Sequence, residues 1–156
     1  LNLQPEMIED IFREAIHHLG RNKRKHNISM HLEDDLLMAN MDARLIIQVL
    51  VNLINNAIKY THENSNISLN ARRVEDKILI EVQDDGNGVL HPDQLFEMFY
   101  TENNRGGDTR RGMGLGLSLC KSIIQSHGGT IWVENVTPHG ACFKFVLDAV
   151  EVKLYE

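Results

Sequence analysis

Polar side chains recur at helical spacing within an otherwise apolar stretch, residues 42–61. On a helix, Asn52, Asn56 and Lys59 would follow one another along one face, with Gln48 and Asn55 beside them. Two amide oxygens one turn apart could hold a hard cation such as Mg²⁺, which takes few protein ligands and adds phosphate and water. The lysine could then meet the anion that this cation carries. The residues alone also allow a second interpretation, in which the amides are core groups that hydrogen-bond their neighbours.

Two glycine-rich stretches could belong to the same site. Residues 84–88 (DDGNG) follow a predicted strand; their glycines let the backbone approach a flat ring, and a buried carboxylate could accept a hydrogen bond from an exocyclic amine. Residues 112–117 (GMGLGL) precede a predicted helix, whose exposed N–H groups and positive dipole end favour an anion. Each pattern also has a simpler explanation: a β-turn for the first, and a helix start or close packing for the second.

The composition indicates one globular α/β domain. The chain has 156 residues, of which 42% are hydrophobic, and this length allows a substantial core. A net charge of −6 argues against non-specific nucleic-acid binding and requires that local basic groups meet any polyanionic ligand. Cys120 and Cys142 lie far apart in apolar runs, which predicts two buried thiols in a reducing compartment. The eight histidines show no metal-ligand spacing, and no signal peptide or membrane span is recognisable.

Hydrophobic periodicity predicts the elements that would position these residues. The stretch 42–61 should form a largely buried helix with Asp42 as its N-cap. A helix is also expected over residues 5–20, with Pro5 in its first turn, followed by a basic loop at 21–26. A third helix should begin at the glycines of residues 112–117 and end at Gly128. Strands are expected at 28–32, 67–74, 77–83, 130–135 and 141–147, a short helical turn at 92–99, and a mobile loop at 100–111.

Four segments resemble conserved boxes of bacterial sensor histidine kinases. Residues 52–60 (NLINNAIKY) resemble the N box, residues 84–88 the G1 box, residues 96–100 (FEMFY) the F box, and residues 112–117 with the following 127–131 (HGGTI) the G2 box and its strand. The resemblance implies the Bergerat (GHKL) ATP-binding fold: an α/β (α+β) two-layer sandwich with a mixed, mostly antiparallel sheet covered by helices on one face. It implies a single catalytic domain over 1–156, with an N-terminal helix and basic loop (1–27), a core (28–147) and a C-terminal tail (148–156).

The resemblance also implies a role for each matching residue. Asn52 and Asn56 would hold Mg²⁺, and Lys59 would contact phosphate. Tyr60 would border the adenine of ATP, and Asp84 would accept a hydrogen bond from its amino group. Five glycines and a leucine would shape the pocket: Gly86, Gly88, Gly112, Gly114, Gly116 and Leu117. Residues 100–111 would form the ATP lid, whose candidate phosphate contacts are Arg105, Arg110 and Arg111.

The implied function is the transfer of the γ-phosphate of MgATP to a histidine. The acceptor is expected on a separate dimerisation domain of the same protein, because no histidine here has the His-Glu/Asp-x-x-Thr/Asn-Pro neighbours; His17 and His18 precede Leu and Gly. The resemblance implies a homodimeric parent in the bacterial inner membrane, with this domain in the cytoplasm, outside the membrane, and a response regulator downstream. Residues 140–145 (GACFKF) further resemble the potassium-responsive (KdpD-like) branch.

Two other classes of function can be compared with the same residues. A GHKL-type ATPase or serine kinase of the gyrase, chaperone or anti-sigma type would resemble this chain but carry Glu where Asn52 stands, to activate water or a hydroxyl. An amide cannot take that proton, so Asn52 argues against this class. An ATP-binding-only regulatory module would be expected to lack a residue of one box, and none is missing.

Overall fold

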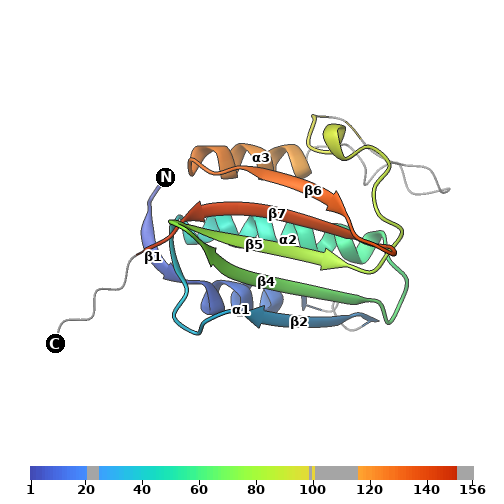
Figure 1. Ribbon diagram of the computed structural model, residues 1–156, viewed down its shortest axis with the longest axis horizontal. Coiled ribbons are helices and arrows are strands. Elements are labelled where there is room, and N and C mark those ends of the chain that lie inside the picture. Colours follow the sequence, from blue (N-terminus) through green and yellow to red (C-terminus); the bar gives the residue numbers. More distant parts are fainter. Residues whose placement is uncertain (21–24, 99, 101–115, 151–156) are drawn as a thin grey trace.

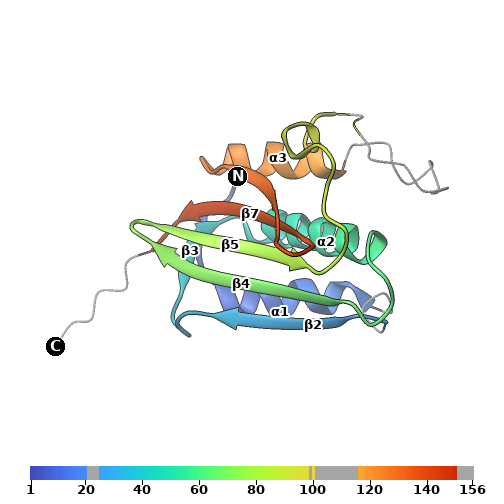
Figure 2. The ribbon, with the colours of Figure 1, turned by 45° about the vertical axis from the view of Figure 1, so that its right-hand side comes forward.

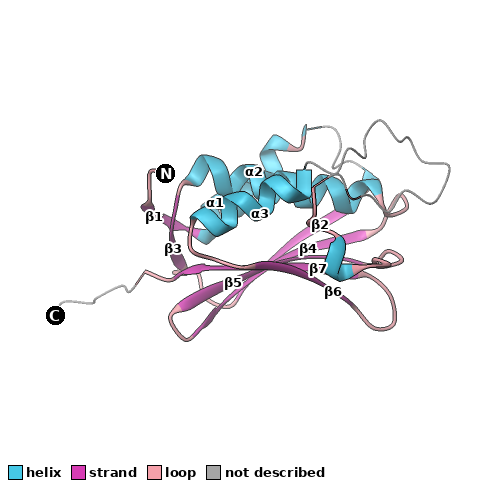
Figure 3. Cartoon of the chain, turned by 90° about the horizontal axis from the view of Figure 1, so that it is seen from above, coloured by secondary structure: helices cyan, strands magenta, loops and turns pink. Residues whose placement is uncertain are grey.

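A mixed five-stranded sheet and three helices form two layers in the computed structural model, which describes residues 1–20, 25–98, 100 and 116–150. All three helices lie on one face of the sheet, as Figure 3 shows. The helices are α1 (Ile8–His18), α2 (Ala43–Lys59) and α3 (Gly116–Ser126). The sheet order is β2-β4-β5-β7-β6, with β2 (Asn27–Leu32), β4 (Asn66–Val74), β5 (Lys77–Asp84), β6 (Ile131–Asn135) and β7 (Ala141–Asp148). The expected two-layer sandwich is confirmed.

The sheet has one parallel pair, and this pair explains the position of α2. Strands β2 and β4 run parallel, whereas β4–β5, β5–β7 and β6–β7 are antiparallel. A parallel pair needs a crossover between its strands, and α2 lies in this crossover, packed on the sheet behind β4, β5 and β7 (Figure 1). The expectation of a mixed, mostly antiparallel sheet is therefore confirmed.

The core lies between the sheet and the helices. Helix α2 contributes Leu50, Leu53 and Ile54, each 0% exposed, and the inward face of β7 contributes Phe143 and Phe145. Full burial of a side chain of this size contributes about 1.5–3 kcal/mol. Helix α1 joins the same cluster through its apolar face: Ile8, Ile11, Phe12 and Ala15. The two cysteines are buried and unpaired by disulfide, as predicted. None of the helices in the described ranges has the length and apolar run that a membrane span requires.

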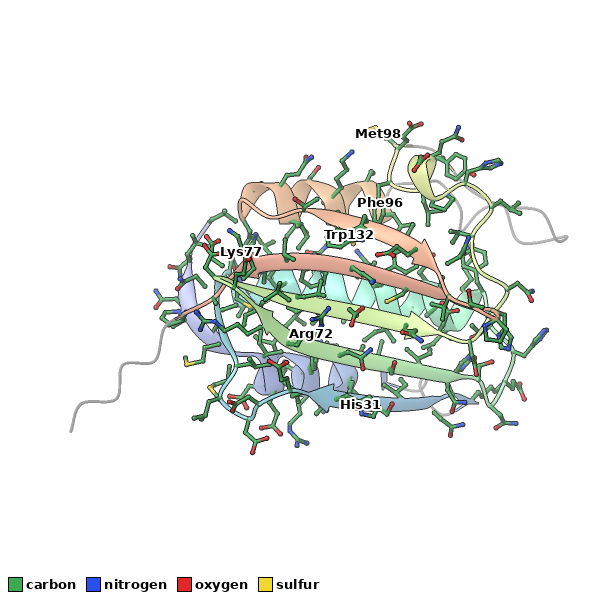
Figure 4. The ribbon with its side chains drawn as sticks, viewed as in Figure 1. His31, Arg72, Lys77, Phe96, Met98 and Trp132 are labelled. Atoms are coloured by element: carbon green, nitrogen blue, oxygen red, sulfur yellow. The ribbon has the colours of Figure 1, made fainter. Side chains whose placement is uncertain are left out.

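The outward face of the sheet is polar, and none of the described helices lies on it. Figure 4 looks onto this face and labels His31, Arg72 and Trp132 on three of its strands. Lys144 of β7 pairs with Glu81 of β5 at 3.4 Å and with Glu134 of β6 at 3.0 Å. These ion pairs cross three neighbouring strands, so they tie the outer surface of the sheet together.

The N-terminal helix is shorter than predicted, because residues 4–7 form a strand. Strand β1 (Gln4–Met7) pairs antiparallel with β3 (Met38–Met41), and Pro5 lies opposite Asn40 in this ladder. The placement of Pro5 in a first helical turn was therefore wrong. A proline is tolerated here because β1 is an edge strand, where one N–H is not needed for pairing. Strand β3 was not predicted at all.

Strand β3 leads directly into the start of α2. Asp42 is the N-cap residue, as predicted: its carbonyl accepts hydrogen bonds from the N–H groups of Leu45 and Ile46, each at 3.1 Å. Its side chain does not cap the helix. Instead, Oδ2 accepts a hydrogen bond from the N–H of Asn2 at 3.1 Å. The aspartate thus joins the N-terminal segment to the helix.

The other predicted elements are present with small differences at their ends. Gly128 ends α3 with φ = +76°, a left-handed conformation that favours glycine. The turn between β4 and β5 lies at residues 75–76, where predicted. The helical turn expected at 92–99 is a 3₁₀ helix over Pro92–Gln94, followed by non-helical turns. Of the loop expected at 100–111, residues 101–111 lie outside the described residues.

His127 fastens the end of α3 to the start of α2. Its Nδ1 lies 2.8 Å from the carbonyl oxygen of Ile123, and its Nε2 accepts a hydrogen bond from the N–H of Asp42 at 3.0 Å. Because a carbonyl only accepts, Nδ1 must carry the proton, so the ring is neutral and in one tautomer. His127 is 8% exposed, so neither partner group has ready access to water if the ring is removed.

We expect His127→Leu to lower the free energy of unfolding by about 1–3 kcal/mol, because it leaves the Asp42 N–H buried without an acceptor. The same substitution at His31, an exposed residue of β2, should change it by less than about 0.5 kcal/mol. Urea denaturation of both variants measures the difference. Equal effects of the two substitutions would contradict this role of His127.

Candidate functional site

The polar stripe of α2 is open along much of its length. Gln48 and Lys59 are exposed, and Asn52, Asn55 and Asn56 are half-buried. Asn52 Nδ2 lies 3.8 Å from Cys120 Sγ on α3, a contact to a weak acceptor. Neither Asn55 nor Asn56 has a side-chain hydrogen bond to any other described residue. Among the described residues, Asn55 and Asn56 are therefore not satisfied core amides, and the side-chain oxygens of Asn52 and Asn56 accept no hydrogen bond.

Asp84 ends β5 as a buried carboxylate with one oxygen already bonded. The side chain is 8% exposed, and Oδ1 accepts hydrogen bonds from the N–H groups of Gly86 at 2.9 Å and Ala141 at 3.2 Å. Burial raises the pKa of Asp84 above its ordinary value; the two backbone hydrogen bonds oppose this shift, and the neighbouring Asp85 adds to it. Both backbone donors use Oδ1, so Oδ2 is left to accept from a ligand.

Gly86 packs the loop after β5 against the end of α2. A Cβ at this position would lie 2.9 Å from Thr61 Cγ2 and 3.2 Å from the carbonyl oxygen of Tyr60. A side chain at position 86 would force the Thr61 methyl group to move and would crowd the Tyr60 carbonyl oxygen, so glycine favours this close approach. Gly88, with φ = +82°, is constrained in the same loop, where a Cβ would lie 2.5 Å from Asn135 Oδ1. The structure thus brings the predicted stretches 52–60 and 84–88 together.

Lys59 and Tyr60 form the exposed end of this region. Tyr60 is 47% exposed, and Lys59 Nζ lies 5.2 Å from the centre of its ring, within the range of a cation–π contact. In the part of the chain that the structure describes, Lys59 has no carboxylate partner. An ammonium with no counter-ion, next to an open aromatic face, is suited to meet an anion attached to a flat ring.

The third predicted stretch is only partly described. Gly116 begins α3, and Leu117 is half-buried against the core instead of fully exposed to a ligand. Gly112, Gly114, Arg105, Arg110 and Arg111 lie outside the described residues. Figures 1 and 2 show the C-terminal ends of α2 and β5 and the N-terminal end of α3 at the same end of the molecule. The resemblance to the F box is accompanied by a buried Phe96, whose ring packs edge-to-face on Phe143 with centroids 6.0 Å apart, and by an exposed Met98 (Figure 4).

Sequence reasoning missed two contributors to the geometry of Asp84. Ala141 lies 57 residues further along the chain and donates its backbone N–H, so no side-chain pattern could indicate it. Thr61 directly follows the predicted stretch 52–60, and this adjacency was the only signal for its packing on Gly86. The described residues contain no group of three or more His, Cys, Asp or Glu side chains that could hold a metal, so a cation site here depends on the amides.

These features define an α/β sandwich with a candidate ligand site, where the helix α2 with its amides meets the strand β5, which ends in a buried aspartate. Residues 41–151 match the family of histidine kinase-, DNA gyrase B- and HSP90-like ATPases, and the chain belongs to this family. It is 35% identical over 142 residues to the sensor protein KdpD of Clostridium acetobutylicum; the match covers 90% of this chain and 16% of that protein.

Solved structures show the same architecture. The catalytic domain of histidine kinase ThkA, in a nucleotide-free form, superimposes with a TM-score of 0.83 at 28% identity, covering 95% of this chain and 98% of that one. Full-length ShkA in complex with AMPPNP superimposes with a TM-score of 0.81 at 26% identity, covering 99% of this chain and 32% of that one. The Bergerat-type fold expected from the sequence is therefore confirmed, and the family supports the use of ATP.

We expect Asp84→Asn to increase the free energy of unfolding of the ligand-free protein at pH 7. Folding raises the pKa of Asp84, so the protonated carboxyl group favours the folded state and the ionised one disfavours it. The wild-type protein therefore loses stability as pH rises through the folded-state pKa. Asparagine keeps an oxygen for the N–H groups of Gly86 and Ala141 but removes the charge. The gain should disappear as pH falls to the ordinary aspartate range near 3.8.

Thermal unfolding from pH 4 to pH 7 measures this effect. The control is Asp35→Asn, which removes an exposed carboxylate. A lower stability of Asp84→Asn than of wild type at pH 7 would show that the charged form is favoured in the folded protein.

Proposed function

We propose that this chain is the catalytic, ATP-binding domain of a sensor histidine kinase. It binds MgATP and presents the γ-phosphate to a histidine on a separate dimerisation domain of the same protein. The observation that carries this proposal is the amide at position 52, which lies on α2 beside an open Asn56. An amide can bind a metal through its oxygen, but it cannot act as a hydrolytic base.

The phosphate end of the nucleotide is assigned to the polar stripe. Asn52 and Asn56 would bind Mg²⁺ through their oxygens, and Lys59 would contact phosphate. Asn56 has no competing side-chain hydrogen bond among the described residues, and Lys59 has no competing carboxylate there. The protein has a net charge of −6, so a polyphosphate depends on such local cations. Arg105, Arg110 and Arg111, with Gly112, Gly114, Gly116 and Leu117, remain assigned to the same end from the resemblance.

The base end is assigned to Asp84 and Tyr60. Asp84 Oδ2 would accept a hydrogen bond from the exocyclic amine of adenine, because Oδ1 is occupied by the N–H groups of Gly86 and Ala141. The half-exposed ring of Tyr60 would border the base. Guanine carries a carbonyl oxygen where adenine carries this amine, and an acceptor facing a carboxylate is unfavourable. The site should therefore prefer adenine nucleotides.

The chemical step needs little from this domain beyond position and charge. A neutral imidazole nitrogen is already a nucleophile, so no strong base is required. Bound Mg²⁺ would neutralise charge on the phosphates. Lys59 would add a positive charge near the phosphates. Contacts of Asp84 with the base and of the amides with Mg²⁺ would together hold the nucleotide in position.

The remainder of the parent protein is proposed from relatives. The chain spans 16% of the length of KdpD from Clostridium acetobutylicum, so a sensor region, a dimerisation domain and a membrane anchor would lie in the rest of a homodimeric parent. A response regulator would receive the phosphate. We assign the chain to the potassium-responsive branch as the finer proposal, supported by 35% identity over 90% of its length.

We expect isothermal calorimetry to show Mg²⁺-dependent binding of ADP. Asp84→Asn should weaken the affinity roughly ten- to a hundredfold, since loss of a charge-assisted hydrogen bond costs about 1.5–3 kcal/mol. Asn56→Ala should remove most of the increment that Mg²⁺ provides. Gln48→Ala, on the same stripe but two turns before Asn56, is the control and should bind like wild type. Unchanged ADP affinity in Asp84→Asn would remove Asp84 from the base site.

The isolated domain should bind MgATP without stable self-phosphorylation and with little hydrolysis. It has no acceptor motif, and position 52 has no carboxylate. Adding a hairpin fragment that carries the acceptor histidine should give acid-labile, alkali-stable phosphate on that fragment, and transfer should fall sharply in Asn56→Ala and Lys59→Ala. Rapid ATP turnover by the domain alone, unaffected by either substitution, would instead identify an ATPase.

A further inference from the structure

His26 lies outside every box and bonds to the residue that follows the N box. It immediately precedes β2, and its Nε2 lies 2.8 Å from Thr61 Oγ1. The Thr61 hydroxyl donates its single proton to the carbonyl oxygen of Ala57 at 2.8 Å. The hydroxyl can therefore only accept from His26, so Nε2 carries the ring proton.

The second ring nitrogen of His26 has no such partner. Nδ1 is buried and makes no hydrogen bond to any of the described residues. A buried acceptor without a donor costs free energy. The hydrogen bonds of the ring are therefore incomplete in its observed position. Among the described residues, the hydrogen bond from Nε2 to Thr61 Oγ1 is the polar contact of this ring.

The segment around His26 is attached to the segment that follows α2. The N–H of Asn64 donates to the carbonyl oxygen of Lys25 at 2.5 Å, and the N–H of Asn27 donates to that of Ser65 at 2.9 Å. An ion pair of 3.2 Å joins Lys25 and Glu63. The backbone on both sides of His26 is thus held by hydrogen bonds, and its ring lies within hydrogen-bond distance of Thr61.

Thr61 connects this attachment to the site. Its hydroxyl is fixed by His26 and Ala57, and this fixes the direction of its methyl group, which occupies the space that a Cβ at Gly86 would need. The N–H of Gly86 in turn donates to Asp84 Oδ1. A continuous series of contacts therefore runs from His26 through Thr61 and Gly86 to Asp84.

We infer that His26 is a positioning residue for Asp84. By donating to Thr61 it holds the methyl group against the loop at Gly86, which keeps the Gly86 N–H on Oδ1 and leaves Oδ2 facing the ligand. This inference rests on the proposed function, which assigns Oδ2 to the adenine amine. It adds a residue that immediately precedes the edge strand β2 to those proposed to determine base selectivity.

The test compares affinities for MgADP and MgGDP, because a general loss of structure weakens both nucleotides while a displaced Asp84 reduces their ratio. His26→Leu removes the donor and should lower the preference for ADP by about three- to tenfold. His26→Gln places an amide donor near Nε2 and should restore most of the preference. His31→Leu, the same substitution on the exposed side of β2, should leave it unchanged.

Thr61→Val provides a second, independent variant, since it removes the hydroxyl and keeps the shape. It should lower the ADP preference to the same extent, and the double variant with His26→Leu should be no worse than either single one. An unchanged ratio of MgADP to MgGDP affinity in His26→Leu overturns the inference; if that variant does not fold, the ratio in Thr61→Val decides. In either case, binding of MgADP by the wild type upholds the proposed function. Absence of MgADP binding by wild type overturns both.

Discussion

The burial of one side of α2 against the sheet is the interaction on which the structure depends. Leu50, Leu53 and Ile54 are completely buried, and the amides lie on the remaining arc of the same helix. The hydrophobic contact therefore fixes both the position and the rotation of the helix, and with them the direction in which Asn52 and Asn56 point. Because helical side chains move together, a rotation that hid the amides would expose the leucines to water.

Most of this arrangement could be predicted from the sequence because it follows from local periodicity. The alternating strands 67–74 and 77–83 and the apolar face of α2 give strong signals over many residues. The pairing of β1 with β3 could not be predicted, since each strand has four residues and is stabilised by a partner more than 30 residues away. Pro5 then favoured a helix start, which is the common local meaning of a proline before acidic residues.

The candidate site shows the same division. The glycines and amides were predicted as candidate site residues, because the chemistry of each residue type is known from the sequence. The supports of Asp84 were not, because a backbone N–H at Ala141 and a methyl group at Thr61 have no distinctive signature in a sequence. The half-open state of the amides was also not determined by composition, since a helix as apolar as α2 is usually surrounded. It follows from the two-layer fold, because no described element covers the side of α2 that faces away from the sheet.

The hydrogen bond from Ala141 to Asp84 has a consequence for protein synthesis. Strand β5 lies between β4 and β7 in the sheet, and β7 is the last of these strands in the sequence. A nascent chain that has emerged from the ribosome only as far as residue 135 already contains the amides, the lysine and the aspartate, yet it lacks the donor that orients Asp84. The proposed orientation of Asp84 toward a nucleotide is therefore acquired only after β7 has been synthesised and has paired with β5.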